Sequence, residues 1–381
     1  MLYHPTYGEL RVEGNRKNGT HIMTDKVRSV VIGAGWWGTT AHIPALLQHP
    51  GAELAGVQHR DQETVDKIAR DFGIPRGVTS VDELFASNDL DAVVISSTVN
   101  MHYRQAKAAL ARGLHVLIEK PMTFSAAEAR TLVELADRHG VQFLISGPWH
   151  YTEHAAEAQR LIRSGSMGDI KMISVLMTNF GLGFFRGLPW DAIFNGADAF
   201  ETAKPPYLKP EQSASSDPAV CGGGQIYNQV SHVGGHLALL TGQEPVEVFA
   251  RFDNHDARVD VSNTLNVKLS SGTLVSIAST GATMQTERNY EVRIYGTEGM
   301  LFMELWKGTM QYHARSGEVR TYPDLSEDAI YPMYAPTTNL VDVVLGTAPN
   351  RSPATLGWSA MKLIEGACES VRTGVNVMVT E

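Results

Sequence analysis

A glycine-rich turn near the start of the chain is the first group of residues that could do chemistry. Gly33-Ala34-Gly35-Trp36-Trp37-Gly38 directly follows an apolar run ending at Ile32. In such a GxGxxG pattern the glycines permit a tight turn, a close approach of backbone to a pyrophosphate, and helix packing on a strand. The turn therefore predicts NAD(P) binding through Gly33, Gly35, Trp37 and Gly38; the alternative is an ordinary glycine-rich turn.

Glu119-Lys120-Pro121 is the second group, and it directly follows the apolar run 115–118. If that run is a strand of a parallel sheet, these residues lie at its carboxyl edge, where ligands of such sheets bind. From chemistry alone, Pro121 could equally fix a turn that leaves Lys120 in solvent.

Asn228 and His232 form the third group and follow the glycines at 222–224. Because they are four residues apart, they share one face of a helix. A lone histidine on an apolar helix is more often a satisfied core residue than a catalyst. His232 and His236 have the same spacing, but we predict no metal site, since the sequence shows neither an HExxH glutamate nor a third ligand.

The choice between NAD and NADP depends on the end of the second strand, which reads Val57-Gln58-His59-Arg60. His59 occupies the place where a carboxylate would bind the ribose 2′-hydroxyl and repel a 2′-phosphate. Arg60 could pair with that phosphate, which favours NADP. Asp61 and Glu63 keep NAD open, and solvated His59 and Arg60 are the alternative.

The elements that must position these residues fall into two regions. Short apolar runs alternate with helical stretches up to about residue 147, which predicts a doubly wound parallel sheet, a Rossmann domain over 24–147. We expect its strands at 28–32, 53–58, 92–96, 115–118 and 142–146, and its helices at 63–72, 81–85, 102–112 and 126–139. Residues 148–381 are expected to form an α+β domain for substrate binding and oligomerisation. Its large, mainly antiparallel sheet is predicted from strands at 170–180, 246–252, 261–269, 273–279 and 290–295.

Two aromatic segments are candidates for the substrate pocket. The long irregular stretch 181–223 carries Phe184, Trp190 and Tyr207, whose rings could stack on a sugar or simply pack in the core. Trp149-His150-Tyr151 lies at the expected domain junction. It is a candidate for substrate binding, with interdomain packing as the equal alternative.

Composition excludes several classes of protein. The 381 residues carry a formal net charge of -9 without a basic stripe, which disfavours a nucleic-acid partner. Two distant cysteines, Cys221 and Cys368, suggest neither a disulfide framework nor a thiolate zinc site, and fit the cytoplasm. No apolar run is long enough to cross a membrane. Residues 1–23 are polar and are expected to form an N-terminal extension.

Taken together, these motifs resemble the glucose-fructose oxidoreductase, inositol dehydrogenase and rhizopine-catabolism (Gfo/Idh/MocA) family. The resemblance runs from about Val27 to near the C-terminus. It rests on the glycine turn, Ser96-Ser97-Thr98 with His102, Glu119-Lys120-Pro121, the glycines leading to Asn228 and His232, Tyr295-Gly296-Thr297-Glu298-Gly299, and Glu369-Ser370 with Thr373-Gly374.

The resemblance implies an NAD(P)-dependent oxidoreductase that acts on a sugar, glycoside or cyclic polyol. Lys120 would reach substrate and nicotinamide together, with a depressed pKa, and His232 would take the hydroxyl proton. Asn228 stands where the family commonly has Asp; its amide would orient the substrate or the His232 ring in catalysis, but the charge that would raise the pKa of His232 is missing. Cofactor contacts are expected from Ser97, Thr98, His102, Glu119 and Lys120, and substrate contacts from Tyr227, Asn228 and His232.

Three other functions share most of these residues. They are an NAD-dependent glycosidase that acts by transient oxidation and elimination, a dinucleotide-binding regulator without catalysis, and an aldose-aldose oxidoreductase that never releases its dinucleotide. The family resemblance also implies a homodimer or homotetramer.

Overall fold

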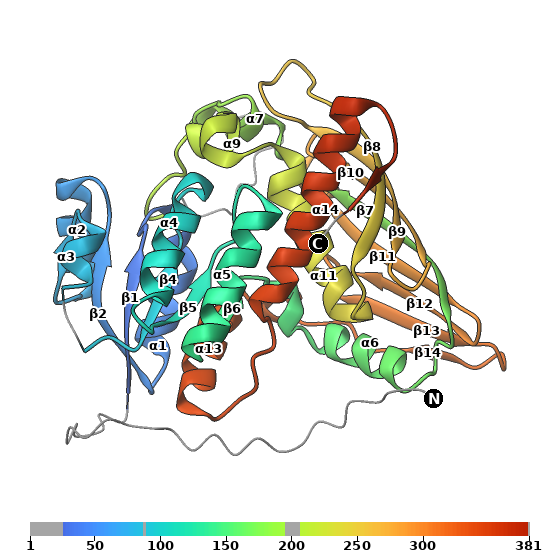
Figure 1. The fold of residues 1–381 in the computed structure, drawn as a ribbon, viewed down its shortest axis with the longest axis horizontal. Coiled ribbons are helices and arrows are strands. Elements are labelled where there is room, and N and C mark those ends of the chain that lie inside the picture. The colour runs from blue at the N-terminus through green and yellow to red at the C-terminus, as the bar shows by residue number, and fades with distance from the viewer. Residues whose placement is uncertain (1–25, 87–88, 195–205, 380–381) are drawn as a thin grey trace.

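The computed structural model describes residues 26–86, 89–194 and 206–379 of the chain (Figure 1). The predicted N-terminal extension, residues 1–23, lies outside the described residues. No helix within the described ranges is long and apolar enough to span a membrane.

The first sheet of the described chain has six strands, all parallel, in the order β3-β2-β1-β4-β5-β6. This confirms the predicted doubly wound sheet. The strands are β1 (Val27–Ile32), β2 (Ala52–Gln58), β3 (Gly77–Val78), β4 (Ala92–Ile95), β5 (His115–Ile118) and β6 (Phe143–Ile145).

Helices cover both faces of this sheet, as a buried parallel sheet requires. Alternate strand residues face two separate apolar clusters, with Val30 in one and Val31 in the other. One cluster includes α4 (Val99–Leu110) and α5 (Ala126–His139), and the other includes α1 (Ile43–Gln48), α2 (Gln62–Phe72) and α13 (Ala335–Leu345).

Local signals fix the ends of several helices. Asp61 precedes α2 and its side chain accepts a hydrogen bond from the Thr64 amide, while Gly73 ends the helix in the left-handed conformation. Ser125 and Gly140 do the same for α5. Such side-chain caps and C-terminal glycines satisfy backbone groups that the helix itself leaves unpaired.

The register of the first sheet brings three loops to one edge. Ile32 of β1 is paired with Ile95 of β4, and Ile95 is paired with Ile118 of β5. The strands therefore end level, and Gly33, Ser96 and Glu119 leave the sheet side by side. This is the carboxyl edge at which the sequence predicts the ligand-binding residues.

The second sheet has nine strands within the described residues, in the order β14-β13-β12-β11-β7-β10-β9-β8-β15. All its neighbours are antiparallel except β7 and β10. The strands are β7 (Ile170–Thr178), β8 (Pro245–Asp253), β9 (Ser262–Leu269), β10 (Leu274–Thr280), β11 (Asn289–Gly296), β12 (Gly299–Glu304), β13 (Thr309–Ala314), β14 (Val319–Thr321) and β15 (Val377–Met378). The predicted mainly antiparallel sheet is confirmed.

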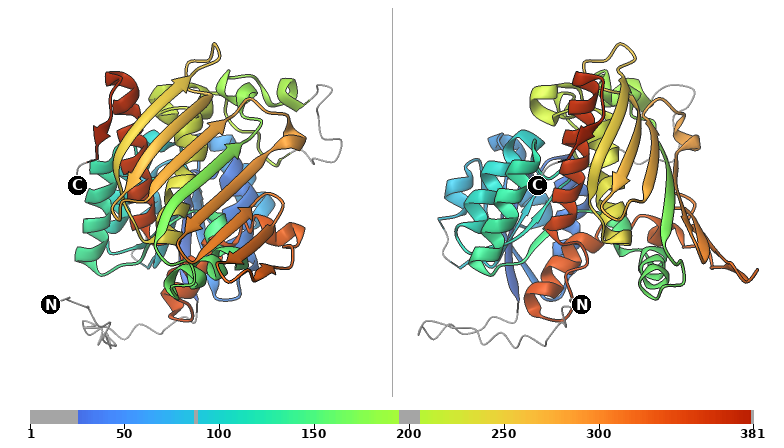
Figure 2. Two further views of the ribbon diagram at one scale, coloured as in Figure 1. Left: turned by 90° about the vertical axis from the view of Figure 1, so that its right-hand side faces the viewer. Right: turned by 45° about the vertical axis from the view of Figure 1, so that its right-hand side comes forward.

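Long helices join the two sheets. The helix α14 (Ala354–Thr373) packs on β8, on α11 (Ser231–Thr241) and on α5 of the first region, and lies between the sheets in Figure 1. Within the described chain, Figure 2 shows no helix over the opposite face of the large sheet. The helix α13 packs on the first sheet although it follows the predicted boundary at 147/148, and that boundary stays a prediction.

Two histidines are buried where α11 meets the junction. The rings of His150, in the short helix η2 (Pro148–Tyr151), and His236, in α11, stack with centroids 6.2 Å apart. His150 Nδ1 lies 2.8 Å from Ser352 Oγ, and His236 Nδ1 lies 3.2 Å from the Tyr290 hydroxyl. Burial lowers the pKa of His150 to about 3 and that of His236 to about 4, so both rings are neutral in the folded protein at pH 7.

We predict that His236→Asn makes the free energy of unfolding fall less steeply as the pH is lowered from 6.5 towards 4. The unfolded chain binds a proton on this histidine below its ordinary pKa of about 6.5, but the folded protein binds it only near pH 4. The stability contributed by neutral His236 is therefore complete above pH 6.5 and is lost as the pH falls towards 4, at up to about 1.4 kcal/mol per pH unit. Urea unfolding from pH 7.5 to 4.5 measures this slope.

The matched control is His139→Asn at the exposed end of α5, which should keep the slope of the parent protein. A His236→Asn profile parallel to that of the parent would contradict the prediction, even if the variant is less stable at every pH.

Candidate active site

A large cavity lies between the carboxyl edge of the first sheet and the start of α11. Its volume is about 1730 Å³, which exceeds the roughly 300–1,000 Å³ typical of one small-ligand site. The cavity therefore has room for a dinucleotide together with a second molecule. The predicted residues that line it are Gly33, Gly35, Trp37, His59, Arg60, Ser97, Thr98, His102, Glu119, Lys120, Trp149, Tyr227, Asn228 and His232.

The glycine turn has the geometry of a ligand cradle. Gly33 has a φ of +77°, and a Cβ there would lie 2.4 Å from the Ser97 backbone, so a side chain is excluded. Gly35 lines the cavity, and a Cβ built on it would meet no atom within 4 Å. A Cβ on Gly38 would lie 3.0 Å from the Gly33 carbonyl oxygen, which explains the third glycine by helix packing. The turn fits an approaching pyrophosphate.

Glu119 is held in place by residues from three parts of the chain. Its Oε1 accepts a hydrogen bond from Trp37 Nε1 at 2.9 Å and lies 3.2 Å from His42 Nε2, while Thr337 contacts the other ring nitrogen at 2.7 Å. Burial acts to raise the pKa of Glu119, but the hydrogen bond from His42 and the charges of His42 and Lys120 outweigh it and lower that pKa. The carboxylate therefore stays ionised in the cavity lining.

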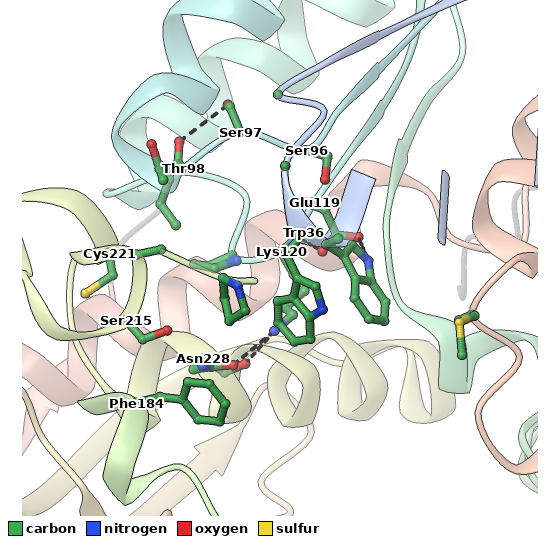
Figure 3. A pocket seen from close by; sticks show the side chains of 18 of the residues that line it. Trp36, Ser96, Ser97, Thr98, Glu119, Lys120, Phe184, Ser215, Cys221 and Asn228 are labelled. Carbon is green, nitrogen blue, oxygen red and sulfur yellow. Dashed lines mark hydrogen bonds between the residues drawn. The ribbon is translucent and has the colours of Figure 1, made fainter. Parts of the chain in front are cut away.

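Lys120 reaches across the cavity to the second region. Its Nζ donates to the Asn228 carbonyl oxygen at 3.0 Å and to Asn228 Oδ1 at 3.2 Å (Figure 3). The Lys120–Pro121 peptide is cis. Burial lowers the pKa of Lys120, against the opposing charge of Glu119. The lowered pKa is in the direction that the family resemblance implies, and its cause in the structure is burial.

His232 lies in the first turn of α11, and the residue is 6% exposed. The Trp149 ring meets it edge-on with centroids 4.9 Å apart. Burial lowers the pKa of His232 well below its ordinary value, and the positive charge of Lys120 lowers it further. The ring is therefore neutral near pH 7 and able to accept a proton.

The backbone around Asn228 is not the regular α-helix that the spacing implied. Residues Ile226–Val230 form a π-helical turn, η3, that leads directly into α11. Such wide turns are rare in proteins, and those that occur are often found at functional sites. Asn228 and His232 nevertheless both face the cavity.

Asp260 holds the start of this helical segment. Its carboxylate accepts hydrogen bonds from the backbone amides of Gly224 at 2.8 Å and Ile226 at 2.7 Å. A Cβ on Gly224 would lie 1.9 Å from the Asp260 carbonyl oxygen, so only glycine fits there. Asp260 is thus a positioning residue for Asn228. It lies too far along the sequence from Asn228 to belong to a short motif, so the sequence did not predict it.

Three predicted residues do not line the main cavity. Gly38 packs under the turn, as described above. His150 is buried against Ser352 and His236, and the Tyr151 hydroxyl donates to Asn339 Oδ1 at 3.3 Å. The structure thus places His150 and Tyr151 in the packing of the junction, and only Trp149 of that group faces the cavity.

Aromatic residues that the sequence analysis missed form one wall. Trp306 and Tyr331 stack with centroids 5.4 Å apart, and both contact Trp149. Trp36, inside the glycine turn, packs edge-on against Trp37 and against Trp190 of the long irregular stretch. The glycine turn that contains Trp36 could have indicated that this residue lies at the site. Trp306 and Tyr331 belong to no motif, and only the tertiary structure places them at the cavity.

The other aromatics of the stretch 181–223 divide between cavity and packing. Phe184 lines the cavity, and Phe185 is fully buried. Tyr207 packs edge-on against Phe72 of the first region, with centroids 5.1 Å apart. Among the described residues, no group of three or more His, Cys, Asp or Glu side chains could hold a metal ion.

Comparison with known proteins identifies the family. Residues 27–146 match a model described as "Oxidoreductase family, NAD-binding Rossmann fold", GFO_IDH_MocA, and residues 155–302 match the GFO/IDH/MocA C-terminal domain. Among curated relatives, an uncharacterized oxidoreductase of Synechocystis is 33% identical over 38% of this chain and 39% of that protein. A dTDP-3,4-didehydro-2,6-dideoxy-alpha-D-glucose 3-reductase of Streptomyces antibioticus is 31% identical over 41% and 48%.

A longer match is the 1,5-anhydro-D-fructose reductase of Ensifer adhaerens, 28% identical over 66% of this chain and 68% of that protein. The first two relatives are matched over less than half of their own length.

Solved structures share the fold over nearly the whole chain. GenD2 from gentamicin A biosynthesis, in complex with NAD, has a TM-score of 0.75 at 21% identity, covering 97% of this chain and 100% of that one. Levoglucosan dehydrogenase, in complex with NADH, has a TM-score of 0.77 at 16% identity, covering 93% and 100%. With both of its regions matched by the family's models, this chain belongs to the Gfo/Idh/MocA family of oxidoreductases.

Proposed function

We propose that this protein transfers a hydride between a nicotinamide cofactor and a secondary alcohol or ketone of a sugar, glycoside or cyclic polyol. The observation that carries the proposal is a single cavity lined by the glycine turn, the Lys120 amine and the His232 imidazole. Relatives named as sugar reductases or dehydrogenases support the substrate class.

The chain's own residues fit the dinucleotide. Gly35 leaves open space beside the backbone, and Gly33 lies where no side chain is possible. Ser97 and Thr98, at the end of β4, line the same cavity and continue the cradle. The bound nicotinamide would supply the hydride acceptor or donor, and the protein supplies binding, orientation and charge.

Lys120 has one donor left for the substrate. An ammonium carries three N–H donors, and two are directed at the carbonyl and side-chain oxygens of Asn228. The third can donate to the substrate oxygen and stabilise the negative charge that develops on it as the hydroxyl proton is removed or, in the reduction direction, as hydride adds to the carbonyl carbon. Asn228 positions this amine.

His232 is the proton acceptor in the oxidation direction. Its ring is neutral because burial and the charge of Lys120 both lower its pKa. A neutral imidazole can take the hydroxyl proton and return it in the reverse reaction. Because Asn228 supplies no charge, His232 is a weaker base than it would be beside Asp, and Lys120 shares the proton transfer.

The aromatic wall suits a sugar-like substrate. Trp149, Trp306, Tyr331 and Phe184 line the cavity, and flat rings can stack on the apolar C–H faces of a sugar ring. Polar groups at the wall, among them Asn179 and Gln229, can meet its hydroxyls.

Assembly and location are also proposals. The uncovered face of the large sheet carries Met172, Leu274 and Met300, which are 38–59% exposed. Met172 and Leu274 are paired on neighbouring strands, and Met300 lies level with them one strand further along, beyond Tyr295 of β11. Apolar side chains on an open sheet favour association, so we propose a homodimer or homotetramer through this face. The proposed cytoplasmic location agrees with two free cysteines in the described chain.

The direct test is absorbance at the reduced-nicotinamide band with NAD and NADP against a panel of sugars, glycosides and inositols. Release of free sugar without net cofactor reduction would identify a glycosidase. Dinucleotide absorbance in the freshly purified protein would identify an oxidoreductase that retains its cofactor. Cofactor binding with no turnover of any panel member would favour a regulator.

Lys120→Ala is expected to lower kcat about 10²–10³-fold, as does loss of one donor to a developing oxyanion elsewhere. Cofactor affinity should change little, because the glycine turn and β4 loop are untouched. Steady-state kinetics together with cofactor titration by tryptophan fluorescence separate the two effects. The exposed Lys107→Ala on α4 is the control. Unimpaired turnover in folded Lys120→Ala protein would remove Lys120 from the mechanism.

Asn228→Asp restores the carboxylate common in the family at a position 3.2 Å from the Lys120 amine. An opposite charge at this distance raises a lysine pKa by about 1 unit or more. We therefore expect the limb of the pH–rate profile governed by Lys120 to move to higher pH. Gln229→Glu adds a charge to the same cavity wall one residue further on and should shift it less. Superimposable profiles for Asn228→Asp and the parent would contradict this assignment.

A further inference from the structure

We infer that Glu211 is a specificity-determining residue that sets the protein's preference for NAD over NADP. This inference rests on the proposed function and deepens it, because it concerns the adenosine end of the same cavity. It revises the preference for NADP that Arg60 suggested in the sequence.

The adenosine end of the cavity is built from both regions of the chain. From the first region, His59, Arg60 and Thr64 line it at the end of β2 and the start of α2. From the second, Leu208 and Glu211 line it opposite them. Glu211 is therefore a carboxylate at the ribose end that the Rossmann sequence pattern does not contain.

Glu211 forms an ion pair with the residue that would read a 2′-phosphate. Arg60 Nη2 lies 2.5 Å from Glu211 Oε1. The pair carries no net charge, so Arg60 offers a 2′-phosphate little net attraction. The two side chains are 73% and 40% exposed, and only Nη2 of Arg60 is bonded to Glu211, so a 2′-phosphate can still reach other guanidinium donors. Its binding would nevertheless bring two negative groups together.

The remaining charges at this end agree with the same preference. Lys209 also lines the cavity, but its Nζ is bonded to both carboxylate oxygens of Asp191, at 2.7 and 2.8 Å. Asp61, which the sequence analysis kept as an NAD determinant, caps α2 and lies outside the cavity lining, as does Glu63. Among the described residues that line this end of the cavity, the carboxylate available to a ribose hydroxyl is therefore Glu211.

The segment that carries Glu211 is fastened to the first region close by. The Tyr207 hydroxyl donates to Asp71 Oδ2 at 2.7 Å, and Lys67 Nζ lies 3.9 Å from the centre of the Tyr207 ring. Asp71 and Lys67 both belong to α2, which starts beside Arg60. These contacts hold Tyr207, four residues before Glu211, against the first region without any ligand.

These contacts define how each cofactor is received. The 2′-hydroxyl of NAD can donate a hydrogen bond to the Glu211 carboxylate, and the Arg60 ion pair can remain intact. The 2′-phosphate of NADP meets a carboxylate and an arginine that is already paired. The discrimination is electrostatic and should weaken as salt concentration rises.

The test compares Glu211→Gln with the parent protein by calorimetric titration of NAD, NADP, ADP-ribose and its 2′-phosphate. The parent should bind NAD and ADP-ribose at least about tenfold more tightly than the phosphorylated partners. Glu211→Gln keeps the size of the side chain but frees Arg60. We expect it to lower that ratio about tenfold or more, mainly by tighter binding of the phosphorylated ligands.

Asp217→Asn is the matched control. Asp217 lies in the same segment and pairs with Arg258, but it does not line the cavity, so its removal should leave the ratio unchanged. A parent protein that prefers NADP would overturn the inference, as would a Glu211→Gln ratio equal to that of the parent. Equal weakening of all four ligands would also overturn it, since Glu211 would then only anchor the segment.

These outcomes are distinct from failure of the proposed function. If neither the cofactors nor the ADP-ribose probes bind the folded parent, the dinucleotide site itself is wrong. If they bind with the opposite preference, only the role of Glu211 is wrong.

Discussion

The contact between the Lys120 amine and Asn228 is the interaction on which the site depends. It joins the carboxyl edge of the parallel sheet to the π-helical turn η3 of the second region, with the Lys120 amine 3.0 Å from the Asn228 carbonyl oxygen and 3.2 Å from its side-chain oxygen. Burial lowers the pKa of Lys120, because it disfavours the charged form of the amine. The two Asn228 oxygens accept hydrogen bonds from it without adding charge, so the amine is fixed in place while its pKa remains low.

Both sides of this contact are supported by buried carboxylates: Glu119 in the cavity lining and Asp260 outside it. Glu119 is bonded by Trp37 and His42 beneath Lys120, and Asp260 is bonded by two backbone amides beneath Asn228. Glu119 thus helps to position Lys120, and Asp260 helps to position Asn228. The geometry of the cavity is therefore determined by residues that a substrate need not touch, which is how precise sites are usually supported.

Much of the fold and part of the site could be predicted from the sequence, because those signals are local. The glycine turn and the residues after β4 and β5 belong to short patterns, and the level ends of the parallel strands bring them together. Trp306 and Tyr331 could not be found in this way, since only tertiary packing places them beside Trp149. The π-helical turn at Asn228 was also missed, because a spacing of four residues implies a regular helix.

The end of β2 shows what a local sequence pattern leaves open about ligand binding. His59 and Arg60 do line the cavity, as the pattern indicated. What a charged side chain offers a ligand, however, depends on the charges already paired with it, and the partner of Arg60 comes from a distant segment. Because an arginine reads the same in a sequence whether or not a carboxylate is paired with it, what Arg60 offers a ligand can be judged only from the tertiary fold.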